Sequence, residues 1–160
     1  MLRNIAVQAI VFFLIFNGLS WLRETGMLAT QTKVSPQYPL ATLLEEPITL
    51  QSNGKKTLIY FFAPWCSVCH ISIENVQSIY ASTPTIDVIG VALDYDDVDE
   101  VREFTNMHQL TFPIALGDES VKKTFKIKGY PSYYVLDEEN TIVSKSMGYS
   151  SEIGMYIRSL

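Results

Sequence analysis

The stretch TLIYFFAPWCSVCH, residues 57–70, decides the expected fold because it joins two different local patterns. Residues 57–62 are β-branched, apolar or aromatic, which is typical of a buried central strand. After Cys69 the apolar residues recur at helical spacing as far as Tyr80. The sequence therefore predicts a strand that ends just before a C-x-x-C motif and a helix that begins at the motif.

Cys66 and Cys69 are the only two cysteines of the chain and lie three positions apart. A bridge this short cannot join distant elements, so the pair indicates chemistry more than a structural role. At a helix start, unpaired backbone N–H groups and the helix dipole stabilise a thiolate. We therefore expect Cys66 to attack a partner's disulfide and the more shielded Cys69 to resolve the mixed disulfide that forms. The two would then form a redox-active disulfide, with no cofactor and no bound metal.

Strands and helices alternate along the remaining sequence. We expect strands at residues 86–93, 132–136 and 141–146, a short apolar stretch at 113–116, helices at 94–108 and 119–125, and a closing helix whose apolar face is Ile153, Ile157 and Leu160. This order predicts an α/β fold in which helices flank a central mixed sheet.

The amino-terminal residues 5–22 form an uncharged run between Arg3 and Arg23. As a helix this run would be about 27 Å long, roughly the hydrocarbon thickness of a bilayer. No A-x-A pattern of small residues follows it, so an uncleaved signal anchor is favoured over a cleaved signal peptide. We expect a transmembrane helix at 1–23, a linker at 24–39 and a folded domain at 40–160.

Two motifs carry a resemblance to a known family. FFAPWCSVCH, residues 61–70, resembles the active-site signature of the thioredoxin superfamily, and GYPS, residues 129–132, resembles its cis-proline loop. The region between them is similar to the TlpA/ResA-like branch, which is typically membrane-anchored. The resemblance covers about residues 40–160 and implies a thioredoxin-like fold and a protein-disulfide oxidoreductase, more often a reductase, that acts on protein thiols and disulfides.

The resemblance also implies a docking surface for the substrate. Tyr130 and Pro131 would pair with a substrate strand through a cis peptide, for which an ordinary trans turn is the alternative. Trp65 would shape the surface beside the disulfide, for which a plain core aromatic is the alternative. A membrane electron donor would reset the cysteine pair.

The sequence departs from the family at the groups that move protons. A buried acid is usual in the strand before the motif, and the matching residue here is Tyr60. The acid and the proline that often follow the second cysteine are replaced by Ser72 and Glu74. Glu74 is either a displaced acid or, as is commoner for glutamate, an exposed carboxylate. The group that accepts the proton of Cys69 is left open.

Two other functions fit the same residues. CSVCH, residues 66–70, matches the haem-attachment pattern of c-type cytochromes. A copper-binding module would use both thiols and His70, and His108 is the only other histidine. The exchange enzyme is favoured because the motif follows a strand and precedes a GYP loop, with His70 as an exposed helix residue.

The charge of the chain limits its partners. A net charge of −5 gives no electrostatic reason for binding nucleic acid. Lysines between residues 122 and 128 are expected to form a solvated helix face. We expect a single-pass protein of a bacterial inner membrane, in contact with the bilayer through residues 5–22, with its domain on the periplasmic or extracytoplasmic side where disulfides form.

Overall fold

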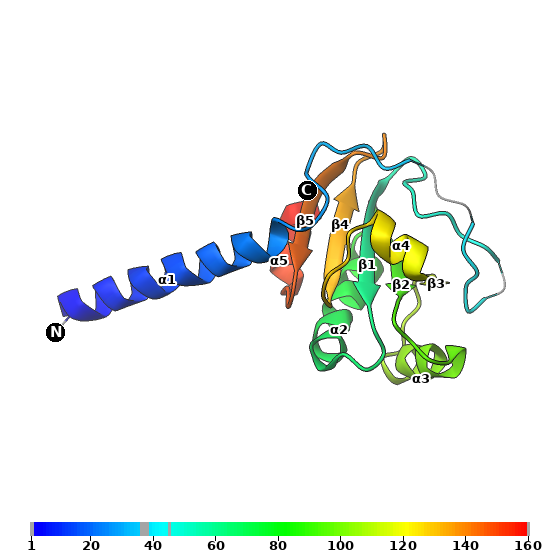
Figure 1. The fold of residues 1–160 in the computed structure, drawn as a ribbon, viewed down its shortest axis with the longest axis horizontal. Helices are drawn as coiled ribbons and strands as arrows, with labels where there is room; N and C mark the ends of the chain where they lie inside the picture. Colours follow the sequence, from blue (N-terminus) through cyan, green and yellow to red (C-terminus); the bar gives the residue numbers. More distant parts are fainter. Residues whose placement is uncertain (1, 36–38, 45, 160) are drawn as a thin grey trace.

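The computed structural model describes residues 2–35, 39–44 and 46–159. A long amino-terminal helix projects from a domain in which helices lie on both faces of a sheet (Figure 1). In chain order the elements are α1 (Leu2–Glu24), β1 (Lys56–Phe62), α2 (Ser67–Ser82), β2 (Ile86–Ala92), α3 (Val98–Met107), β3 (Ile114–Leu116), α4 (Glu119–Thr124), β4 (Ser132–Leu136), β5 (Ile142–Met147) and α5 (Glu152–Ser159).

The sheet has five strands in the order β3-β2-β1-β4-β5. β1 lies at its centre and pairs in parallel with β2 and antiparallel with β4. β3 extends the parallel half and β5 extends the antiparallel half. The predicted α/β fold with a central mixed sheet is confirmed. Because β1 is central, the loop at its carboxyl end lies at the middle of one sheet edge.

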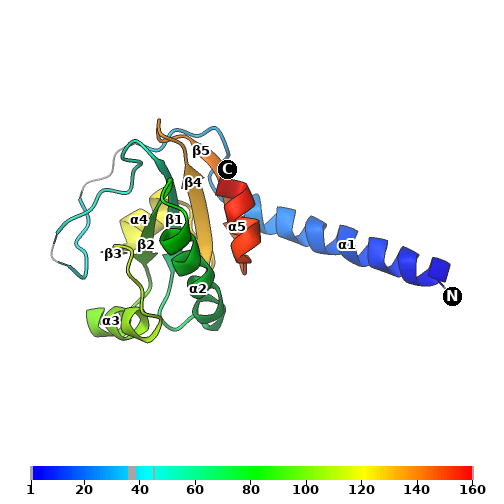
Figure 2. The same cartoon turned by 180° about the vertical axis from the view of Figure 1, so that it is seen from behind.

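The two faces of the sheet have separate hydrophobic clusters, since alternate residues of a strand point to opposite sides. Leu58, Tyr60 and Phe62 pack on the face covered by α2, α3 and α5. Ile59 and Phe61 pack on the other face, against α4 and the segments before β1. Figure 2 shows α2 and α5 side by side on the first face. We call the first cluster the reactive face, because it contains both cysteines, and the second the α4 face.

The closing helix does not bury the side predicted from the sequence. α5 buries Met155 and Ser159, whereas Ile153 and Ile157 are 73% and 62% exposed. Leu160 lies outside the described residues. The predicted apolar face is wrong because a few apolar positions in a short helix leave its rotation open, and packing against α2 and β5 sets that rotation.

The helix predicted at 94–108 is shorter in the structure. α3 begins at Val98 because the carboxylate of Asp97 accepts a hydrogen bond from the backbone N–H of Asp99 and caps the helix. Asp94 has a φ of 50°, which takes the chain out of β2 in a sharp turn. The acidic residues that suggested a helix start therefore form the loop and the cap.

The amino-terminal run is helical, as predicted, within α1. Among the residues that the structure describes, however, no helix has both the length and the apolarity needed to cross a bilayer. The side chains of residues 2–6, 16–17 and 19–22 lie outside that description. The transmembrane helix predicted at 1–23 is therefore not found in the structure and rests on the sequence alone.

Part of the predicted linker lies against the sheet. The backbone N–H of Gln31 donates to the carbonyl of Ile142, and that of Val34 donates to the carbonyl of Asn140. Met27 and Val34 are buried in the α4 face. The chain between α1 and the domain is thus held to β5 and the turn before it, and the division at residues 24–39 stays a prediction.

Candidate active site

The cysteine pair lies where β1 gives way to α2, as predicted. Cys66 is the N-cap of α2, with an extended backbone, and its Sγ accepts a hydrogen bond of 3.2 Å from the backbone N–H of Cys69. Both cysteines are free thiols. Cys66 is 7% exposed and Cys69 is fully buried. The helix start therefore offers an N–H group to the Cys66 sulfur, and of the two cysteines only Cys66 has any exposed surface.

The surroundings of Cys69 keep its sulfur protonated. Burial raises the pKa of the Cys69 thiol, and its hydrogen bond with Cys66 raises that pKa further. A backbone hydrogen bond at Ala63 acts in the opposite direction. The two thiols thus differ in access and in environment, which is the difference that an attacking and a resolving sulfur require.

Two of the residues predicted to dock a substrate, Trp65 and Tyr130, meet next to the C-x-x-C motif. Trp65 is 64% exposed, so it is not a core aromatic. Its ring meets that of Tyr130 edge to face, with the centroids 5.9 Å apart. The peptide between Tyr130 and Pro131 is cis, as the resemblance implies. Pro131 is buried, and its carbonyl accepts a hydrogen bond from the backbone N–H of Gly148.

Asp94 connects these aromatic residues and was missed in the sequence. Its carbonyl accepts a hydrogen bond of 2.7 Å from the indole N–H of Trp65, and its carboxylate accepts one of 3.0 Å from the hydroxyl of Tyr130. The same carboxylate pairs with Lys122. Burial, followed by this hydrogen bond, raises the pKa of the Tyr130 hydroxyl.

A signal for Asp94 is present in the sequence. Asp94 follows the buried strand β2 directly, and β2 runs parallel to β1. The carboxyl ends of parallel strands meet at one edge of a sheet, so the residue after β2 lies near the motif after β1. A polar residue at that position was a candidate for the site on this argument.

His70 is not the exposed helix residue that we expected. Its Nε2 lies 2.9 Å from the carbonyl oxygen of Pro64, and its Nδ1 lies 2.8 Å from Nε2 of His108. Because a carbonyl only accepts, Nε2 of His70 carries the hydrogen and Nδ1 accepts from His108. Both ring nitrogens are thus engaged within the fold, so neither is free to bind a haem iron.

Glu74 faces solvent, as the commoner outcome for glutamate predicts, and its side chain is 74% exposed. One of its carboxylate oxygens lies 3.6 Å from Nδ1 of His108. Burial and the neighbouring His70 lower the pKa of His108, while Glu74 raises it.

Among the described residues no three histidine, cysteine, aspartate or glutamate side chains gather where they could share a metal ion, so the ligand set of a copper module is not assembled there.

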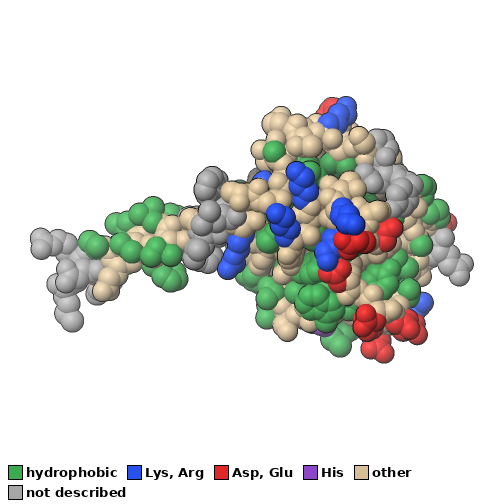
Figure 3. Space-filling model, in the orientation of Figure 1, with side chains coloured by type: hydrophobic (Ala, Val, Ile, Leu, Met, Phe, Trp, Pro, Cys, Tyr) green, Lys and Arg blue, Asp and Glu red, His purple; other side chains and the backbone are tan. Residues whose placement is uncertain are grey.

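The lysines near α4 lie among acidic side chains. Lys122 pairs with Asp94, and Lys123 lies 3.8 Å from Glu119. On the face of the molecule that carries α4, Figure 3 shows basic side chains next to acidic ones. This mixed surface agrees with a solvated helix face.

Comparison with known proteins identifies the family. Residues 33–145 match the model of the AhpC/TSA family. The chain is 30% identical over 130 residues to the thioredoxin-like protein YneN of Bacillus subtilis (strain 168), which covers 79% of this chain and 75% of the relative. It is 24% identical over 144 residues to the sporulation thiol-disulfide oxidoreductase A of the same organism, covering 86% and 87% of the two chains.

Solved structures agree on the fold. The crystal structure of StoA from Bacillus subtilis superimposes with a TM-score of 0.67 at 22% identity, over 77% of this chain and 96% of that one. A thiol:disulfide interchange protein from Chlorobium tepidum TLS gives a TM-score of 0.70 at 19% identity, over 82% and 96%. The chain therefore belongs to the AhpC/TSA family and is a thioredoxin-like thiol-disulfide oxidoreductase similar to the TlpA/ResA branch.

Proposed function

We propose that this oxidoreductase exchanges disulfides with extracytoplasmic proteins through Cys66 and Cys69, and that it acts as a reductase. The observation that carries the proposal is the difference between the two sulfurs. Cys66 lies at the helix start with its Sγ accepting a backbone hydrogen bond, and Cys69 lies behind it, fully buried. A partly exposed sulfur that accepts a hydrogen bond at a helix start, with a fully buried thiol in the same turn, is the arrangement that two successive exchanges require.

In the first exchange the thiolate of Cys66 attacks a substrate disulfide. One substrate sulfur leaves as a thiolate, and a mixed disulfide forms between Cys66 and the other. Cys69 then attacks the sulfur of Cys66, gives up its proton, and releases the second substrate sulfur as a thiol. The enzyme is left with a disulfide between Cys66 and Cys69, and two electrons from a membrane donor reset it. The reverse sequence would oxidise a substrate.

The surface around Cys66 suits a protein substrate. Trp65 presents an exposed indole next to the motif, and Tyr130 supports that ring from the side. We assign Trp65, Tyr130 and Pro131 to docking, because a large aromatic surface beside the reactive sulfur buries apolar area of a bound chain.

Location is the part of the proposal that rests on the sequence. The uncharged run at residues 5–22 supports an anchor in the inner membrane, with residues 24–39 as linker and 40–160 as the domain outside. Fractionation of cells that express the full chain should place it with the membrane. A membrane-impermeant thiol reagent should label Cys66 in intact spheroplasts. Labelling only after lysis would reverse the proposed orientation.

The experiment that tests the function replaces the resolving sulfur. In Cys69→Ala the mixed disulfide cannot be resolved, so partner proteins should accumulate on Cys66 and separate as high-mass adducts that reductant removes. The matched control is the double variant Cys66→Ala/Cys69→Ala, which should trap nothing. Absence of reductant-sensitive adducts in Cys69→Ala would refute disulfide exchange. The identity of the trapped proteins distinguishes apocytochrome substrates from general disulfide reduction.

A further inference from the structure

The turn that carries Cys66 is only partly fixed by its own hydrogen bond. The backbone N–H of Cys66 donates to the carbonyl of Ala63 at 3.0 Å and closes a β-turn. Pro64 and Trp65 are the two central residues of that turn. The orientation of the peptide between the central residues distinguishes turns of type I from those of type II. A group that holds the carbonyl of Pro64 therefore also holds the backbone that leads to the docking indole and the reactive sulfur.

His70 holds that carbonyl from the start of α2. Its Nε2 lies 2.9 Å from the carbonyl oxygen of Pro64 and carries the hydrogen, because a carbonyl only accepts. The backbone N–H of His70 donates to the carbonyl of Cys66 at 3.2 Å within the same helix start. One residue thus binds the beginning of the helix and the turn before it, through its backbone and its side chain together.

His108 sets which nitrogen of His70 carries the hydrogen. A neutral imidazole has two forms, and the partner of one nitrogen determines the state of the other. Nε2 of His108 lies 2.8 Å from Nδ1 of His70, so the hydrogen that it donates keeps Nδ1 bare and leaves the hydrogen of His70 on Nε2. His108 is the C-cap of α3, 38 positions away, and its side chain is 8% exposed. The hydrogen bond to Pro64 therefore depends on a residue of another element.

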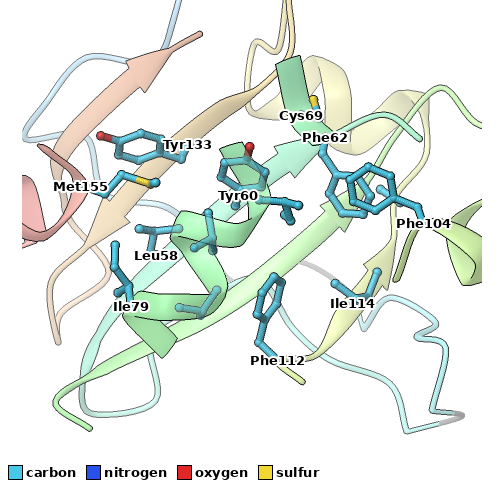
Figure 4. Close-up of a cluster of buried hydrophobic side chains, with 14 of the residues drawn as sticks. Leu58, Tyr60, Phe62, Cys69, Ile79, Phe104, Phe112, Ile114, Tyr133 and Met155 are labelled. Carbon is cyan, nitrogen blue, oxygen red and sulfur yellow. The ribbon is translucent and has the colours of Figure 1, made fainter. Parts of the chain in front are cut away.

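The two imidazoles pack against a shared aromatic ring. The ring centroid of Phe104 lies 4.6 Å from that of His70 and 4.8 Å from that of His108. Phe104 in turn stacks on Phe62 at the end of β1, with the centroids 4.7 Å apart (Figure 4). The end of β1, the start of α2 and the end of α3 thus meet around these rings. This packing limits the movement of both histidines.

We propose that His70 and His108 are positioning residues for disulfide exchange, His70 by holding the carbonyl of Pro64 and His108 by fixing the form of His70 that does so. The inference rests on the proposed function, in which Cys66 attacks first. Neither imidazole gives up its hydrogen during that attack. The fixed turn keeps the Sγ of Cys66 against the backbone N–H of Cys69, and this hydrogen bond stabilises the attacking thiolate.

The test follows the first exchange alone, in full-length protein that carries Cys69→Ala. The thiolate of Cys66 attacks 5,5′-dithiobis(2-nitrobenzoate), forms one mixed disulfide and releases one coloured thiolate. Adding His70→Leu to this parent should slow the reaction about fivefold, since one neutral hydrogen bond is lost. His70→Gln should stay within about twofold of the parent, because its amide can donate to Pro64 and accept from His108.

His108 acts through His70, so the effects of replacing the two should not add. His108→Leu should slow the reaction about threefold, whereas His108→Gln, whose amide still donates, should keep the parent rate. The double variant His70→Leu/His108→Leu should be no slower than His70→Leu. Nitrogen-15 NMR of the imidazoles gives a second readout. The hydrogen of His70 should lie on Nε2 in the parent and should exchange between both nitrogens in His108→Leu.

The matched control is Val101→Ala, which empties part of a buried position on α3 and removes no hydrogen bond. It should lower the stability of the protein and leave the exchange rate unchanged.

Four results would overturn the inference: an equal slowing in Val101→Ala, the parent rate in His70→Leu, additive losses in the double variant, or a hydrogen on Nδ1 of His70 in the parent. If His70→Leu fails to fold, the comparison of His108→Leu with His108→Gln carries the test. A parent protein that does not react with the reagent at all would instead refute the proposed function itself.

Discussion

Two buried tyrosines on neighbouring strands, Tyr60 on β1 and Tyr134 on β4, show how differently the two faces of the sheet are built. Both are fully buried. On the α4 face, the Tyr134 hydroxyl donates to the carbonyl of Phe125 at 2.7 Å and accepts from the backbone N–H of Leu28 at 2.9 Å. On the reactive face, the Tyr60 hydroxyl has no backbone partner, and the hydroxyl of Ser72 is the neighbour that lowers its pKa. The Tyr134 hydroxyl therefore joins β4 to the segments around it, whereas the Tyr60 hydroxyl makes no hydrogen bond to the backbone.

The same contrast appears in the acidity of the two hydroxyls. Burial raises the pKa of Tyr134 to about 12, and the N–H of Leu28 lowers it in part. The pKa of Tyr60 is also raised by burial, and a charge on Cys69 raises it further. The Tyr134 hydroxyl is therefore bonded to the backbone, whereas the pKa of the Tyr60 hydroxyl is raised first by burial and then by Cys69.

The largest effect should come from removing the paired hydroxyl. Tyr134→Phe leaves the N–H of Leu28 and the carbonyl of Phe125 without this partner, so it should lower the free energy of unfolding by about 1–3 kcal/mol. Tyr60→Phe removes a hydroxyl that makes no hydrogen bond to the backbone, so it should change that free energy by less than about 1 kcal/mol. Urea unfolding followed by circular dichroism measures both. An equal loss of stability in the two variants would remove the contrast between the faces.

A smaller effect is expected where the reactive face meets solvent. Tyr130→Phe keeps the ring against Trp65 but loses the hydrogen bond to Asp94, so the docking surface should be held less firmly. The KM for a protein disulfide should rise about fivefold, which is the change expected when one neutral hydrogen bond is lost. Steady-state kinetics with a protein disulfide, compared with the rate of alkylation of Cys66, provides the measurement.

The control for that prediction is Asp94→Asn, whose amide oxygen still accepts from Tyr130 and which tolerates the positive φ of this position. Asp94→Asn should therefore raise the KM less than Tyr130→Phe does. A larger increase in Asp94→Asn would mean that the charge of Asp94, paired with Lys122, matters more than the hydrogen bond.

The smallest effect concerns the pH dependence of stability. Burial and the adjacent His70 lower the pKa of His108 from its ordinary 6.5, against the opposing influence of Glu74. The unfolded chain then binds the proton more tightly than the folded one, so this contribution is present above pH 6.5 and is lost as the pH falls through the lowered folded value. The free energy of unfolding should fall more steeply from about pH 7 to pH 5 in the wild type than in His108→Gln.

Urea unfolding at several pH values checks this expectation. The carboxylates titrate in both the wild type and His108→Gln, so the difference between their stability curves reports on His108. Parallel curves would contradict the lowered pKa of His108.

The sequence by itself determined the features that depend on neighbouring residues. Side chains alternate between the two faces of a strand, and apolar residues recur about every 3.6 positions in a surface helix. Residues 57–70 therefore predict both a central strand and the helix that starts at the cysteine motif. The order of the later elements follows from the same patterns and leads to the mixed sheet. The presence of Tyr60 and Ser72 where the family resemblance implies other groups was also visible, although the approach of these two side chains to each other was not.

Only the tertiary structure decided which distant residues meet. His70 and His108 are 38 positions apart and share a hydrogen bond, Asp94 reaches both Trp65 and Tyr130, and residues 27–34 lie along β5. The buried side of α5 was likewise set by its neighbours. No local period encodes such contacts, because they arise from the parallel pairing of β1 with β2 and from how each helix is rotated on the sheet.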